Sequence, residues 1–256
     1  MYFWYGDLHK GKTEAIIITS KRKVKNTQGF VITHDNQTIS PSHVVKYLGL
    51  QINNTLSGDE IVQSILGKAN ARMKFLYRHR DHLNFKAKKT LAQALIFSHF
   101  EYAMGAWYMA LTKKHKKSLQ TAQNKVVRFV LDLGPRAHIG QSELDRVGLL
   151  CVEDRALQLI LHSMYDIHHG TAPNYLADNF VLNRNRYLTR SNQNSFIVQR
   201  TKSLAKSNFS IVGAIAWNNL PNNIKLIQPK LTFKRAVKTY LKTKSHQREN
   251  SDFLFY

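Results

Sequence analysis

Apolar residues recur at helical spacing from Asp59 onward, and this change of period constrains the fold more than any other feature of the sequence. A stripe repeating every three to four residues places its members on one face of a helix, which then has to pack against other elements. Charged residues fall mostly between the members of the stripe. The stripe comprises Val62, Ile65, Ala69, Met73, Leu76 and Tyr77.

The same reasoning predicts further helices along the rest of the chain. The second is richest in large apolar residues and is expected to be the buried centre. Gly134-Pro135 is expected to end the third, and Gly170 the fifth. The expected ranges are 86–110, 112–133, 142–149, 152–169 and 231–244, and the polar segment 179–201 is expected to be a linker.

The first fifty residues differ, because short β-type runs at 15–19 and 44–52 are separated by a polar, turn-rich stretch. Two strands alone are marginally stable in water, so other elements must cover them. The sequence therefore predicts a mainly α fold with a small N-terminal β element, an α+β organisation.

Charge is distributed unevenly over a chain with a formal net charge of +22. The net charge is +10 over residues 59–140, −4 over 141–180 and +12 over 181–256. Hydrophobic residues still make up 43% of the chain, which is enough to form a core. This balance predicts binding to RNA or DNA through phosphates, although ribosomal, histone-like and merely basic proteins share it.

No run of about 18 apolar residues and no signal-peptide pattern occur, so neither a membrane nor secretion is expected. The single cysteine, Cys151, excludes an internal disulfide and a Cys-rich zinc site. We therefore expect an intracellular protein of the nucleus or the cytoplasm.

A cluster of cations begins the third predicted helix and continues along it. The helix dipole disfavours cations at this end, so another interaction should offset them. Backbone phosphates are the natural partners of such a strip, and a solvated charged face is the alternative. The predicted nucleic-acid-binding residues are Lys113, Lys114, Lys116, Lys117, Lys125 and Arg128.

Catalytic and metal-binding patterns are weak throughout. The best histidine cluster comprises His162, Asp166, His168 and His169, but no second spacing typical of zinc sites accompanies it. No nucleophilic triad, P-loop or dinucleotide-binding loop is recognisable. We therefore predict no catalytic residues, no metal site and no cofactor for this chain.

Six short segments of the chain stand out by their order and spacing. They are 12–18 (KTEAIII), 47–53 (YLGLQIN), 98–103 (SHFEYA), 119–125 (LQTAQNK), 170–176 (GTAPNYL) and 216–221 (AWNNLP). Together they resemble the C-terminal part of non-LTR retrotransposon reverse transcriptases of the LINE, jockey-like kind. The first two resemble the fourth and fifth conserved polymerase motifs.

This resemblance implies a palm remnant at 1–56, a helical thumb at 59–133, a helical segment at 141–180 and a basic C-terminal extension at 181–256. Lys12 resembles a lysine near the incoming nucleotide, and Tyr47, Leu48 and Gly49 resemble the primer grip. The intact family holds Mg²⁺ on aspartates that include an Asp-Asp pair. No such pair occurs here, and only eleven residues precede Lys12.

The expected function is therefore that of a catalytically inactive fragment of an RNA-directed DNA polymerase that binds template and primer but cannot extend the primer. One alternative is a non-catalytic RNA- or DNA-binding module that uses the same helices. The other is an unused pseudogene product whose basic character is inherited.

Overall fold

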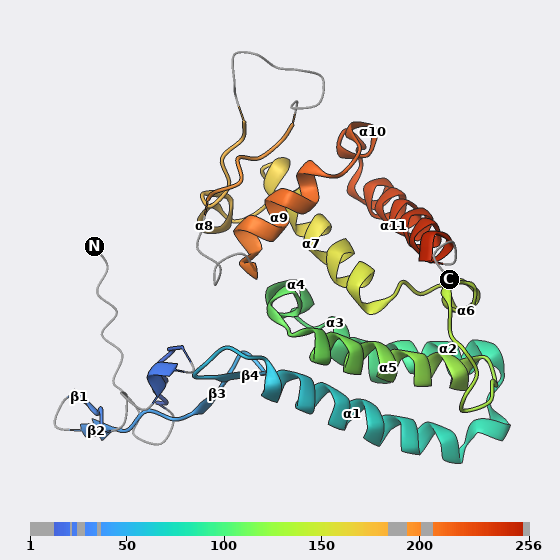
Figure 1. Cartoon of the computed structure of the whole chain (residues 1–256), viewed down its shortest axis with the longest axis horizontal. Coiled ribbons are helices and arrows are strands. Elements are labelled where there is room, and N and C mark those ends of the chain that lie inside the picture. The colour runs from blue at the N-terminus through green and yellow to red at the C-terminus, as the bar shows by residue number, and fades with distance from the viewer. Residues whose placement is uncertain are drawn as a thin grey trace. The chain divides into compact units, whose positions relative to one another are not determined.

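The computed structural model describes residues 13–20, 22–24, 29–34, 37–183, 194–200 and 207–252. The protein is mainly helical with a small antiparallel β element near the N-terminus, so the predicted fold class is confirmed (Figure 1). The chain divides into two compact units, Met1–Gly67 and Lys68–Tyr256, and the division falls within helix α1 (Asp59–Arg78).

Two β-hairpins form the regular structure of the first unit. Strand β1 (Ile32–His34) pairs with β2 (Gln37–Ile39), and β3 (Val44–Tyr47) pairs with β4 (Leu50–Asn53). The run expected as one strand at 44–52 is thus a hairpin. Its turn residues Leu48 and Gly49 have φ angles of 46° and 84°, as a two-residue turn that matches the strand twist requires.

The strand predicted at 15–19 does not form. This segment is irregular and is tied to the β3–β4 hairpin by backbone bonds at its two ends only. The Ser42 amide donates to the Ala15 carbonyl at 2.8 Å, and the Thr19 amide donates to the Asn54 carbonyl at 2.8 Å. Two isolated hydrogen bonds do not make a β-strand, so the β propensity of residues 15–19 predicted a strand that does not form.

The second unit consists of helices. Short helices connect the long ones, and the segment Gln93–Phe97 is a π-helix. The α-helices are α2 (Phe85–Ala92), α3 (Ser98–Glu101), α4 (Met104–Trp107), α5 (Lys113–Val130), α6 (Gln141–Val147), α7 (Val152–His168), α8 (Asn174–Ala177), α9 (Phe209–Asn218), α10 (Asn222–Lys225) and α11 (Lys230–Asp252); Arg80–His82 and Tyr108–Ala110 are 3₁₀ turns.

The single helix predicted over 86–110 is broken into α2, the π-helical segment, α3 and α4. The break after α3 lies at Tyr102, whose backbone is extended, and Ala103, whose φ is 49°. The Trp107 indole donates to the Tyr102 carbonyl at 3.0 Å and so satisfies a group freed by the break. An apolar pattern continues through this break, which is why the periodicity did not reveal it.

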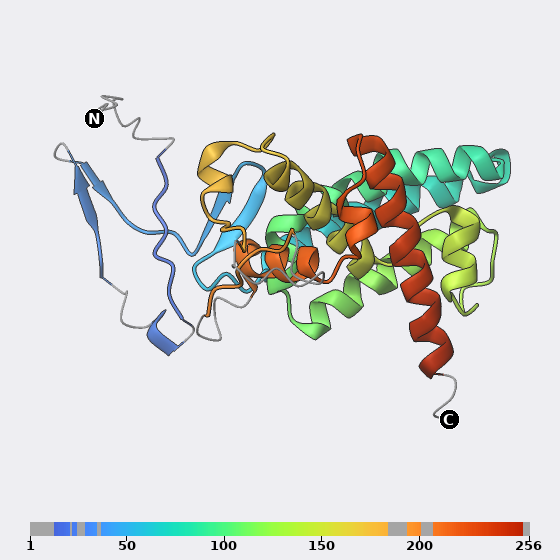
Figure 2. The same ribbon diagram turned by 90° about the horizontal axis from the view of Figure 1, so that it is seen from above.

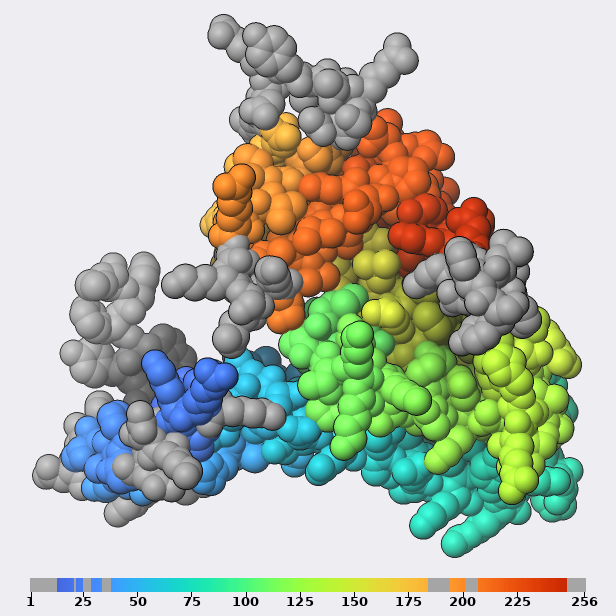
Figure 3. All heavy atoms as spheres, viewed as in Figure 1, coloured from blue at the N-terminus to red at the C-terminus, as the bar shows by residue number. Residues whose placement is uncertain are grey.

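Helix α7 lies at the centre of the second unit and contacts α4, α5, α9 and α11 (Figure 1). In the space-filling view it shows mainly as a band between neighbouring segments (Figure 3). Figure 2 shows that the last turns of α11 extend past the other helices. The largest side chains of this core include Ile160, Met164, Trp217, Phe233 and Leu241.

The segment expected as a linker is packed into this core at both described ends. Phe196 is 4% exposed, and its ring lies 5.6 Å from that of Phe180. The Asn218 side chain bonds both the amide and the carbonyl of Phe196, each at 2.8 Å. The linker interpretation is therefore wrong for these ends, because side chains on both sides of the expected linker pack against the same core.

Candidate nucleic-acid interface

Helix α5 carries the predicted cations, and its local structure follows from its apolar face. Leu119, Val126 and Val130 are each at most 1% exposed, as their spacing predicts. The Thr112 hydroxyl caps the helix by accepting from the His115 amide at 3.4 Å. This cap helps to offset the cations at the unfavourable end of the helix dipole.

Most of the predicted cations share the opposite face of α5. At about 100° per residue, Lys113, Lys114, Lys117, Lys125 and Arg128 fall within an arc of about 120° centred opposite the buried stripe. The first four are exposed, whereas Arg128 is half-buried. From Lys113 to Lys125 the helix rises about 18 Å, so these cations form a strip along the helix.

Two of the six predicted residues have partners within the protein. The Lys116 ammonium lies 3.4 Å from a carboxylate oxygen of Glu153 and 5.1 Å from the ring centre of Tyr108. Arg128 donates through Nε to the Ala137 carbonyl at 2.8 Å. Lys116 is thus held toward α7, outside the arc of the other five.

The structure adds two cations from another helix, because α1 and α5 border a common groove of about 670 Å³. Lys74 and Arg78 of α1 line this groove together with Lys125 and Arg128 of α5. The sequence could have indicated Lys74 and Arg78, because they lie four residues apart and so share the polar face of α1. The apolar lining residues are Ala69, Met73, Ala122, Val126 and Pro135.

An aromatic side chain also lines the groove. Tyr77 is 44% exposed, although its position in the stripe predicted an inward face. Its ring packs edge-on against the buried Phe129 ring at 5.1 Å, which fixes its position. The groove therefore combines cations, an apolar floor and one partly exposed aromatic ring.

The positions that resemble polymerase motifs belong to the other compact unit. Lys12 lies outside the described residues. Tyr47 and Leu48 are 62% and 72% exposed at the tip of the β3–β4 hairpin, next to Gly49. An exposed hairpin tip is compatible with binding a macromolecule.

Two members of the histidine cluster, Asp166 and His169, have partners among neighbouring side chains. Burial, with Lys234 and Arg155 nearby, lowers the pKa of His162 to about 4, so this side chain is neutral at pH 7. Asp166 pairs with Lys230 at 2.6 Å, and His169 stacks on Tyr165. Within the described residues, no three potential ligands are placed to hold a metal ion.

The final basic helix, α11, also uses part of its charge internally. The Lys238 ammonium donates to the Gly148 carbonyl at 2.8 Å, and Lys242 lies 2.5 Å from Asp145. Hydrogen bonds from Lys242 and His246 lower the pKa of Asp145 despite its partial burial. Arg235 and Lys244 remain exposed on the same helix.

No helix among the described residues is both long and apolar enough to cross a membrane. Comparison of the chain with protein-family models, with curated proteins and with solved structures finds no match.

Proposed function

We propose that this protein binds RNA or DNA through the groove between α1 and α5, as a catalytically inactive fragment of a retrotransposon RNA-directed DNA polymerase. The observation that carries the binding proposal is the convergence of Lys74, Arg78, Lys125 and Arg128 on one groove from two helices. The strip of Lys113, Lys114 and Lys117 continues the positive surface along α5. The six segments that resemble non-LTR retrotransposon reverse transcriptases support the assignment to this family.

Phosphate contacts should dominate the binding. Lys and Arg side chains neutralise backbone phosphates and release counterions, which makes the affinity steeply dependent on salt. No base-reading motif is recognisable in the sequence, so selectivity among sequences should be low. A primer–template duplex should bind at least as well as a single strand.

The absence of an Asp-Asp pair from the sequence argues against polymerase chemistry, because two-metal catalysis needs clustered carboxylates. We therefore propose a binding role without nucleotide transfer, and we expect no Mg²⁺ dependence of binding beyond general screening by salt.

A charge-matched pair of variants tests this proposal. The groove variant carries Lys74→Gln, Arg78→Gln and Lys125→Gln, and it spares Arg128 because that side chain bonds the Ala137 carbonyl. The control variant carries Lys234→Gln, Arg235→Gln and Lys244→Gln on α11. Affinity for an RNA–DNA duplex should fall about tenfold or more in the groove variant and much less in the control.

Five of the six replaced side chains are exposed, and Lys234 is half-buried. Because charges at such positions contribute little stability, thermal unfolding of both variants should stay close to wild type. An equal loss of affinity in both variants would show a diffuse polycation without a defined site. No loss in either would show that the basic surface does not bind nucleic acid.

A further inference from the structure

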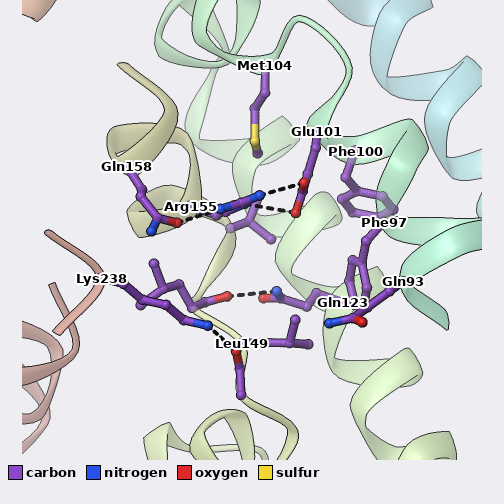
Figure 4. Close-up of a pocket in the computed structure, with 13 residues that line it drawn as sticks. Gln93, Phe97, Phe100, Glu101, Met104, Gln123, Leu149, Arg155, Gln158 and Lys238 are labelled. Atoms are coloured by element: carbon purple, nitrogen blue, oxygen red, sulfur yellow. Dashed lines mark hydrogen bonds and ion pairs between the residues drawn. The ribbon is translucent and has the colours of Figure 1, made fainter. Parts of the chain in front are cut away.

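A second, smaller cavity lies inside the helical unit, away from the groove (Figure 4). Its volume is about 130 Å³, well below the roughly 300 Å³ at which pockets for drug-sized molecules begin. Six segments supply polar groups to its walls. These groups include Gln93, Glu101 of α3, Gln123 of α5, the loop residue Gly148, Arg155 of α7 and Lys238 of α11.

One wall of the cavity is electrostatically balanced. Arg155 binds Glu101 through two hydrogen bonds of 2.8 and 2.6 Å, and its third bond, of 2.6 Å, goes to Gln158 (Figure 4). This bidentate pair fixes the guanidinium and neutralises its charge locally. Gln123 is also fixed, because it donates to the Leu150 carbonyl at 2.9 Å.

The wall beside Gly148 carries a lysine that forms no ion pair with a described residue. The Lys238 ammonium has three protons, and it donates one bond, to the Gly148 carbonyl at 2.8 Å (Figure 4). Within the described part of the chain, no carboxylate pairs with Lys238 or with Lys89. The nearby Lys242 does have such a partner, Asp145.

Lys89 of α2 is not a lining residue of the cavity, but its ammonium approaches one of them, Gly148. A Cβ atom added to Gly148 would lie 3.3 Å from the Lys89 ammonium, so two lysines from distant helices converge on this glycine. Gly148 has a φ of 78° and ends α6, a conformation that side chains other than glycine rarely adopt. Burial is the main cause that lowers the pKa of Lys238; Lys242, Arg155 and Lys89 lower it further, whereas Asp145 raises it.

We propose that this cavity binds a small oxyanion of the phosphate class, held by the ammonium groups of Lys238 and Lys89 beside Gly148. The ligand would pair with two ammonium groups that form no ion pair among the described residues, and charge-assisted hydrogen bonds to an oxyanion are strong. The size of the cavity excludes a whole nucleoside. The oxyanion is either free phosphate or the terminal phosphate of a strand, and the inference does not depend on the groove.

The test is a calorimetric titration of the full chain with inorganic phosphate in a chloride buffer of constant ionic strength. The wild type should bind phosphate saturably, and Lys238→Met and Lys89→Met should each weaken binding about tenfold or more, as the loss of a hydrogen bond to a charged group implies. Arg235→Gln, which removes the same charge from an exposed position, should change the affinity less than about twofold.

If Lys238→Met fails to fold, Lys89→Met decides the question, because Lys89 makes no hydrogen bond to the Gly148 carbonyl. Equal weakening by Arg235→Gln, or unaltered binding in both lysine variants, would overturn the proposal. The groove variant should retain phosphate binding, which separates this site from the nucleic-acid interface.

Competition by a 5′-phosphorylated but not a 5′-hydroxyl oligonucleotide would identify a strand end as the source, and no competition would identify free phosphate.

Discussion

Lysines of this chain occupy quite different environments, so the total charge overstates what is available to a ligand. Lys117 and Lys125 are exposed, whereas Lys116 pairs with Glu153. Lys88 is 4% exposed and pairs with Asp132 at 2.5 Å. Lys225 is 1% exposed, and burial lowers its pKa. Residue type alone cannot separate these cases, because the partners lie far away in sequence.

His162 should make the stability of the protein depend on pH. Its pKa is about 4 in the folded state against 6.5 ordinarily, so between these values only the unfolded chain takes up the proton. The free energy of unfolding should therefore fall as the pH falls from 6.5 toward 4. The contribution lost between pH 7 and pH 5 is on the order of 2 kcal/mol.

Urea unfolding of wild type and His162→Gln at pH 7 and pH 5 measures this contribution. The decrease in unfolding free energy between the two pH values should be smaller in the variant. His138, which is exposed, provides the matched control as His138→Gln. An identical decrease in wild type and His162→Gln would contradict the burial of a neutral imidazole.

At the scale of elements, periodicity located the long amphipathic helices well. Helices α5 and α7 begin within a residue of the expected positions, because a polar face and an apolar face alternate clearly along them. Helix α9 (FSIVGAIAWN) was not predicted, because its own residues are apolar on almost every face and so form no amphipathic stripe. The short strands β1 and β2 were also missed, because they lie in a polar stretch. They form through pairing with each other in the hairpin.

Helix caps provide a prediction at this scale. The Asn84 side chain accepts from the Ala87 amide at 2.9 Å at the start of α2, so Asn84→Ala should lower the free energy of unfolding by about 1 kcal/mol. Asn208 occupies the same position before α9 but makes no side-chain cap bond, which makes Asn208→Ala the matched control. Chemical denaturation of both variants measures the difference, and equal losses would contradict the assigned cap.

At the scale of the whole molecule, the sequence predicted a mainly helical fold and one side of the candidate interface. The exposed strip on α5 could be predicted because a single helix determines which of its residues share a face. The groove could not, since it requires the packing of α1 beside α5, and neither could the pairing of Lys116 with Glu153 on α7. Both the groove and this ion pair depend on contacts between elements that are distant in sequence.

A lysine footprint tests the proposal that nucleic acid occupies the groove between α1 and α5. The protein is treated with an amine-acetylating reagent with and without a bound RNA–DNA duplex, and the modified lysines are quantified by mass spectrometry. The duplex should protect Lys74 and Lys125, which line the groove, and should leave Lys244 on α11 reactive. Equal protection of all three lysines, or protection of Lys244 alone, would contradict the account.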